Sequence, residues 1–180
     1  MGFTLPEVAI ALTLMTVVLG SALSVMFYTE RFLEQQLQQY GVEQTGRRVI
    51  ARLSGDLRAA EPTTIAPALL EDSTAIHFQK VVGYSEEGGT ILSAPISISF
   101  ELAPGEVANG QDDNGDGRPD EGSIVYAETG APSYAIAGNV LGLRFTSREG
   151  GVTLEVELGL VDRQGRLLRR TFSQSLSFRN

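Results

Sequence analysis

The pattern of hydrophobic and polar positions divides the chain into a helical part and a strand-rich part. An uncharged, mostly apolar run extends from Val8 to Thr29. A helix rises about 1.5 Å per residue, so a run of about 22 residues is long enough to span a bilayer. Beyond this run, apolar residues continue at helical spacing, namely Phe32, Leu33, Leu37 and Tyr40, then Val49, Ile50, Leu53 and Leu57. The pattern predicts one long helix that is membrane-spanning in its first half, amphipathic in its second half, and ended by Pro62.

The remainder of the chain has the patterns of β-strands. Residues 74–82 alternate, residues 91–102 are rich in β-branched and apolar side chains, and residues 86–89 between them are typical of a turn. Three further strands are expected around Leu143, Leu154 and Leu176, with hairpin signals at residues 149–151 and 162–165. No helix-length pattern separates these strands, so we expect an antiparallel sheet. The predicted fold class is α+β, with a long N-terminal helical spine packed on an antiparallel β-sheet head.

Composition restricts the chemistry that the chain can perform. The formal net charge is −8 and the pI about 4.7. This argues against nonspecific binding to nucleic acid, which requires a basic surface. The chain has no cysteine, and therefore neither a disulfide nor a thiolate metal site. Its single histidine, His77, lies in a strand-like stretch, and no Gly-x-Ser-x-Gly motif is present. We therefore do not expect an enzyme.

The most specific pattern is at the N-terminus, where Gly2-Phe3-Thr4-Leu5-Pro6-Glu7 precedes the apolar run. A carboxylate at the edge of a membrane segment is costly and normally marks a function. Pro6 suits the first helical turn, where its missing N–H is not needed, and Glu7 lies where the helix dipole favours a negative charge. The pattern therefore places a functional carboxylate at the start of a membrane helix.

This segment resembles the class III signal of type IV pilins and of type II secretion pseudopilins. The resemblance implies that a prepilin peptidase cuts between Gly2 and Phe3 and methylates the new N-terminal Phe3. It also implies that Glu7 pairs with the free amine of a neighbouring subunit's N-terminal Phe during assembly. The alternative is an ordinary signal anchor with an incidental Glu, but such a signal has a basic n-region and a small-residue cleavage site after its apolar core.

The leader differs from the family pattern in one respect, because Met1 and Gly2 provide no Lys or Arg before the cut. The orientation therefore cannot be predicted from upstream charge. Arg31 follows the apolar run closely, and the positive-inside rule alone would place it on the cytoplasmic side. The resemblance instead implies a single-pass protein of the bacterial inner membrane with its head in the periplasm or extracytoplasmic space.

Three later segments narrow the resemblance to the J-type pseudopilins and the minor pilin PilW group. They are the Arg-rich residues 47–60, the stretch Asn139-Val140-x-Gly-Leu143-x-Phe145, and the terminal Phe178-Arg179-Asn180. The resemblance implies a leader at residues 1–2, a transmembrane half-helix at 3–29, an amphipathic half-helix at 30–61 and a β-rich head at 62–180.

The function that this resemblance implies is that of a minor pilin or minor pseudopilin. Such a subunit lies near the tip of a type IV pilus or of a type II secretion pseudopilus and helps to prime filament assembly. Its partners would be other minor subunits, the major subunit, the prepilin peptidase and the inner membrane, and no nucleic acid is expected. The choice between the two machines stays open.

Two other functions are compatible with the same anchor. One is an adhesion or DNA-uptake binding subunit, which an exposed aromatic or basic patch on the head would favour and the acidic net charge disfavours. The other is a membrane-anchored enzyme, and the single histidine and missing nucleophile motif count against it.

An acidic, glycine-rich segment, residues 111–122, lies between the two strand groups. The side chains at positions 1, 3, 5 and 9 of an EF-hand-like calcium loop are Asp112, Asn114, Asp116 and Asp120. Gly117 holds position 6, and the main-chain carbonyl of Arg118 is the expected seventh-position donor. Position 12 holds Ser123 in place of a bidentate Glu, so Glu121 is the expected substitute. These hard oxygen donors favour a structural Ca²⁺ over a transition metal, and the alternative is an acidic surface loop that binds no ion tightly.

Overall fold

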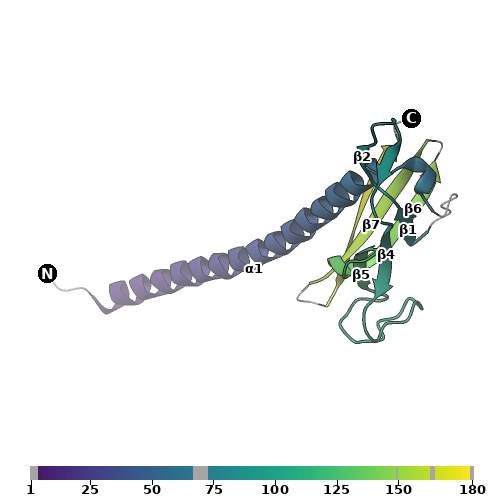
Figure 1. Cartoon of the computed structure of the whole chain (residues 1–180). Helices are drawn as coiled ribbons and strands as arrows, with labels where there is room; N and C mark the ends of the chain where they lie inside the picture. Colours follow the sequence, from purple (N-terminus) through teal and green to yellow (C-terminus); the bar gives the residue numbers. More distant parts are fainter. Residues whose placement is uncertain (1–3, 67–72, 149, 163–164, 179–180) are drawn as a thin grey trace. The chain divides into compact units, whose positions relative to one another are not determined.

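The computed structural model describes residues 4–66, 73–148, 150–162 and 165–178. Figure 1 shows its elements, which begin with the helix α1 (Leu5–Arg58) and the short 3-10 helix η1 (Pro62–Thr64). The strands that follow are β1 (Ala75–Phe78), β2 (Val81–Tyr84), β3 (Thr90–Leu92), β4 (Ile96–Leu102), β5 (Gly122–Glu128), β6 (Tyr134–Arg148), β7 (Gly151–Val161) and β8 (Leu167–Ser177). The chain divides into two compact units, one that ends at Tyr40 and one that begins at Gly41.

The first unit is helical from Leu5 onward. Its segment Leu5–Glu30 has a mean hydropathy of 2.2 and is long and apolar enough to cross a membrane, a test that a signal sequence near the N-terminus also passes. Hydroxyl side chains in this segment donate to main-chain carbonyls about one turn earlier, and they are those of Thr13, Thr16, Ser21, Ser24 and Thr29. Such internal bonds satisfy hydroxyl groups where a bilayer offers no water. The polar residues of the apolar run are therefore compatible with a membrane environment.

Within the described residues, the second unit contains a six-stranded sheet in the order β1-β4-β5-β6-β7-β8, in which all neighbours are antiparallel. This arrangement confirms the predicted antiparallel sheet and, together with α1, the α+β class. Gly150 lies in the turn between β6 and β7, and Gly165 in the turn between β7 and β8, with φ of 73° and 75°. The two hairpin signals predicted at these positions are therefore confirmed.

Two segments that were each expected to form one strand instead form two. Residues 74–82 contain β1 and β2, and residues 91–102 contain β3 and β4. Strands β2 and β3 pair with each other in a separate two-stranded sheet. The first segment breaks where Lys80 forms an isolated bridge with Ala60, just beyond α1. The second breaks around Pro95, which has no N–H to contribute to a ladder.

Helix α1 ends at Arg58, four residues before the predicted end at Pro62. A residue that precedes proline is pushed out of the α region, and Glu61 has the extended angles φ −75° and ψ 118°. The helix must therefore close before Glu61. The N–H of Ala60 still bonds to the carbonyl of Leu57, at 3.2 Å, and completes the last turn.

The core of the second unit joins the C-terminal part of α1 to the sheet. Val49, Leu53 and Leu57 lie four residues apart and are at most 3% exposed, so they form one apolar stripe. The sheet residues of the same buried cluster include Ile76, Ile98, Ile124, Val140, Phe145, Leu154 and Val156. The second half of the predicted amphipathic pattern thus faces the sheet.

Gly46 of α1 packs against the ring of Phe172 in β8. It is buried, and a Cβ built on it would lie 2.2 Å from the ring of Phe172. Gly55 is exposed, and a Cβ there would meet nothing within 4 Å. Alanine in place of an exposed helical glycine stabilises by up to about 1 kcal/mol, since it has the better helix propensity. Overpacking a filled site costs about 1–3 kcal/mol.

We therefore expect the two alanine substitutions to have opposite signs. Gly55→Ala should raise the free energy of unfolding, and Gly46→Ala should lower it because the Phe172 ring must move. Urea unfolding of the full chain in detergent measures both. Equal stabilisation by the two variants would show that the Phe172 contact imposes no constraint.

Candidate functional site

Glu7 forms a cap with Thr4 at the start of α1. The N–H and the hydroxyl of Thr4 both donate to Glu7 Oε2, each at 2.8 Å. The helix begins at Leu5, so Glu7 is its third residue, from which a carboxylate can reach back to a main-chain N–H that has no helical partner. The Thr-x-x-Glu spacing alone is a capping signal, a role that the resemblance to pilins did not suggest. The predicted processing residues Gly2 and Phe3 lie outside the described residues.

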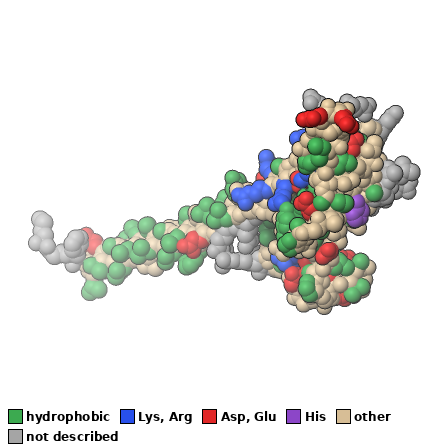
Figure 2. Space-filling model, viewed as in Figure 1, with side chains coloured by type: hydrophobic (Ala, Val, Ile, Leu, Met, Phe, Trp, Pro, Cys, Tyr) green, Lys and Arg blue, Asp and Glu red, His purple; other side chains and the backbone are tan. Residues whose placement is uncertain are grey.

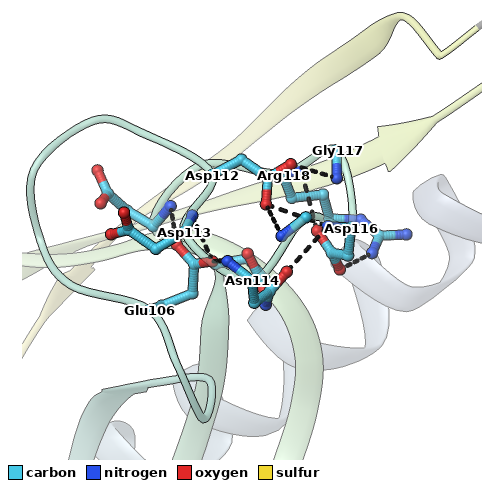
Figure 3. A network of polar contacts seen from close by, with 10 residues as sticks. Glu106, Asp112, Asp113, Asn114, Asp116, Gly117 and Arg118 are labelled. Carbon is cyan, nitrogen blue, oxygen red and sulfur yellow. Dashed lines mark hydrogen bonds and ion pairs between the residues drawn. The ribbon is translucent and has the colours of Figure 1, made fainter.

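The acidic segment is part of a longer loop between β4 and β5, and Glu106 organises it (Figure 3). The Glu106 side chain is 8% exposed. Its Oε1 accepts the main-chain N–H groups of Asp113 at 3.1 Å and Asn114 at 2.9 Å, and its Oε2 accepts that of Asp120 at 2.9 Å. One carboxylate therefore ties both ends of the acidic segment together. Nothing in the sequence marks Glu106, because its partners are main-chain groups that only the folded loop brings to it.

Three of the predicted calcium ligands form one compact turn. Asp112 Oδ1 accepts the N–H groups of Gly115 at 2.7 Å and Asp116 at 3.1 Å, and Asp112 Oδ2 accepts that of Gly117 at 2.7 Å. Asn114 Oδ1 accepts the N–H of Asp116 at 2.9 Å. Gly115 and Gly117 have φ of 81° and 87°, the left-handed region that favours glycine. The two glycines thus let the chain fold around the Asp112 carboxylate, which is labelled with its hydrogen bonds in Figure 3.

Arg118 and Glu121 extend this turn into a larger polar network. Arg118 Nη1 lies 2.6 Å from Asp116 Oδ2, so the guanidinium neutralises part of the local negative charge. Asn114 Nδ2 donates to Glu121 Oε1 at 2.6 Å. The Glu121 side chain is 4% exposed and therefore comes from beneath the loop surface. The structure thus brings together the predicted ligands Asp112, Asn114, Asp116, Arg118 and Glu121.

Asp120 is placed differently from the other predicted ligands. Its Oδ1 accepts the N–H of Asn109 at 2.9 Å and its Oδ2 that of Gly110 at 2.7 Å. The backbone of Asp120 has a φ of 53°, an uncommon value for a residue other than glycine. In the part of the chain that the structure describes, no three Asp, Glu, His or Cys side chains form a group that could hold a metal ion. Through its bonds to Asn109 and Gly110, the Asp120 carboxylate stabilises the preceding part of the loop.

A second cluster of charged and aromatic side chains joins α1 to the sheet. Lys80 Nζ lies 2.7 Å from Asp56 Oδ1. Burial lowers the pKa of Lys80, but the hydrogen bond and charge of Asp56, together with Tyr126, more than offset this, so the pKa is raised. The Arg52 guanidinium lies over the rings of Tyr134 and Tyr126, at 5.2 and 5.9 Å, and donates to the Tyr134 hydroxyl. These cations and aromatic rings therefore serve contacts within the unit.

Comparisons with known proteins found no match among protein-family models, curated proteins or solved structures.

Proposed function

We propose that the protein is a minor pilin or minor pseudopilin, a structural subunit that helps to prime filament assembly with related minor subunits and the major subunit. The observation that carries the proposal is the position of Glu7. Glu7 is the third residue of α1, which begins at the third residue after the proposed cut and continues as a segment able to cross a membrane. The β-rich second unit would be the extracytoplasmic head.

The contacts of Glu7 support a role in assembly. The Thr4 N–H that Glu7 binds is the next main-chain nitrogen after that of Phe3. Cleavage after Gly2 would turn the Phe3 nitrogen into a charged amine. In the low-dielectric core of a filament, an amine and a carboxylate of neighbouring subunits attract each other far more strongly than in water. The cap would hold the carboxylate in position before such a neighbour arrives.

One observation favours an adhesion or DNA-uptake subunit on the same anchor as a second candidate. Arg47, Arg48 and Arg58 are exposed on α1, and Figure 2 shows Lys and Arg side chains gathered along the C-terminal part of this helix. The net charge of −8 and the internal contacts of Arg52 weigh against a broad basic surface. DNA binding that weakens steeply with salt would distinguish this candidate.

The experiment that tests the proposed function is recovery of the chain from filaments. We expect the wild-type chain, expressed in its own cells, to co-purify with filaments sheared from the surface or with overproduced pseudopili. Glu7→Val should still insert into the membrane, because the change removes a costly group. Its share of the filament fraction should fall by at least about tenfold, as when one partner of a buried charge pair is lost.

Glu7→Gln separates the two roles of this side chain. Its amide oxygen can still accept the Thr4 N–H, but it carries no charge. Assembly that depends on charge pairing should fail in both variants, whereas normal incorporation of Glu7→Gln would leave Glu7 only its capping role. A wild-type chain confined to the membrane fraction would contradict the proposed function. If the chain does co-purify with filaments, the neighbouring genes decide which machine it serves. A secretin gene would indicate the secretion machine, and a gene for a retraction motor would indicate the pilus.

A further inference from the structure

The loop between β4 and β5 is longer than a connection between adjacent strands requires. It extends from residue 103 to residue 121, and loops beyond roughly 12–15 residues usually have a function or are disordered. This loop is internally bonded through the Glu106 carboxylate and the turn around Asp112. Its conformation therefore presents several oxygen atoms in a defined arrangement.

Glu121 provides an observation that is independent of the acidic spacing. Glu121 is 4% exposed as a residue, its Oε1 accepts a hydrogen bond from Asn114 Nδ2, and its Oε2 is buried without a hydrogen-bond partner among the described residues. An unpartnered buried carboxylate oxygen is costly, because it has lost its water without replacement. A cation bound beside Asn114 would satisfy it. Glu121 would thus supply the carboxylate that position 12 lacks, since Ser123 already belongs to β5.

The neighbouring side chains have acceptor capacity left for a cation. A carboxylate offers about four lone-pair sites, and Asp112 uses three of them for the N–H groups of Gly115, Asp116 and Gly117. The Arg118 guanidinium is the local positive charge at Asp116, but its Nε is buried without a partner among the described residues. The guanidinium is therefore incompletely satisfied in this position.

We propose that this loop binds one Ca²⁺ through the side chains of Asp112, Asn114, Asp116 and Glu121 and the main-chain carbonyl of Arg118. All five donors are hard oxygen atoms, as Ca²⁺ prefers. In the structure the three carboxylates do not yet form a group that could hold a metal ion, so binding must draw them inward to the distance of about 2.3–2.6 Å at which Ca²⁺ takes six to eight ligands. Mg²⁺ prefers a tighter octahedral site and should bind poorly. Asp120 and Glu106 hold the loop in shape through main-chain N–H groups. The inference does not rest on the proposed function.

Calorimetric titration of the full chain in detergent with CaCl₂ tests the proposal. We expect one site with a dissociation constant between about 10⁻⁵ and 10⁻³ M. Asp112→Asn combined with Asp116→Asn should weaken binding by about 10–100-fold, and Glu121→Gln by about tenfold. Asp113→Asn is the matched control, because it removes one charge from the same loop, but among the described residues the Asp113 carboxylate accepts a hydrogen bond only from the Asn109 amide. Its affinity should stay within about twofold of wild type.

Arg118→Gln keeps the test decisive if the Asp variants fail to fold. It leaves the main-chain carbonyl unchanged and removes the guanidinium that competes for Asp116, so it should bind Ca²⁺ a few-fold more tightly. Melting temperatures in EDTA report whether each variant folds. The proposal is overturned if wild type binds no Ca²⁺ at millimolar concentration, if Asp113→Asn weakens binding as much as the double variant, or if Mg²⁺ binds equally well.

Discussion

A Gly2→Leu variant should retain its leader completely when it is coexpressed with a prepilin peptidase. Under the same conditions the wild-type chain should become one that begins with N-methylated Phe3. Glycine presents no side chain at the proposed cut, whereas leucine places a branched group beside the scissile bond. Mass spectrometry of the intact N-terminus distinguishes the two products directly, and the expected change is from full processing to none.

Gly20→Leu is the matched control for this experiment. It introduces the same side chain within the apolar segment, where a Cβ meets nothing within 4 Å. The variant should insert and be cut as wild type is, because leucine suits a membrane helix. A wild-type chain that keeps Met1 beside an active peptidase would contradict the prepilin interpretation. Cleavage after the apolar run would indicate an ordinary secretory signal.

Phe145→Ala should lower the free energy of unfolding of the second unit by about 3–5 kcal/mol. Phe145 is 0% exposed in β6 and lies opposite Leu154 of β7. Its N–H and C=O both bond to Ser73, at 2.8 and 3.0 Å, and alanine keeps these main-chain bonds. The loss therefore comes from the burial of the ring that is given up and from the cavity that it leaves. A domain typically has only about 5–15 kcal/mol of stability, so this is a large fraction.

Scanning calorimetry of the full chain in detergent should show the midpoint of the head transition fall by roughly 10 °C. Tyr84→Ala provides the control, because Tyr84 is 75% exposed on β2. Its removal should change the stability by no more than about 0.5 kcal/mol. If the two variants shifted the midpoint equally, Phe145 would not be part of a tightly packed core.

The acidic loop shows which contacts can be predicted from the spacing of residues along the chain and which cannot. Asp112, Asn114 and Asp116 were recognised from their spacing, and the structure places them in one turn because each bonds to main-chain groups only two to five residues away. Asp120 has the expected spacing but its carboxylate bonds to Asn109 and Gly110. The difference arises because the earlier part of the loop folds back on it, which no spacing rule contains.

The sequence by itself determined the features whose cause lies within a few residues. The stripe at Val49, Leu53 and Leu57 follows from helical periodicity, and the apolar run follows from its unbroken apolar composition. The turns at Gly150 and Gly165 follow from glycine-containing hairpin signals between alternating segments. The Gly2–Glu7 pattern suggests the functional hypothesis from the sequence alone, and the structure adds the cap that Glu7 forms with Thr4.

Only the tertiary structure decided the features that depend on residues far apart in the chain. The alternating pattern of residues 74–82 continues without a break, but the segment forms two strands. It divides at Lys80, which forms a β-bridge with Ala60 and an ion pair with Asp56 near the end of the helix. Gly46 is needed because Phe172, from the last strand, packs on it. Glu106 organises the acidic loop through N–H groups that come together only when the loop closes. In each case the contact partner is decided by how the chain packs in three dimensions. A local pattern of polar and apolar residues does not indicate which distant group will lie against a given residue.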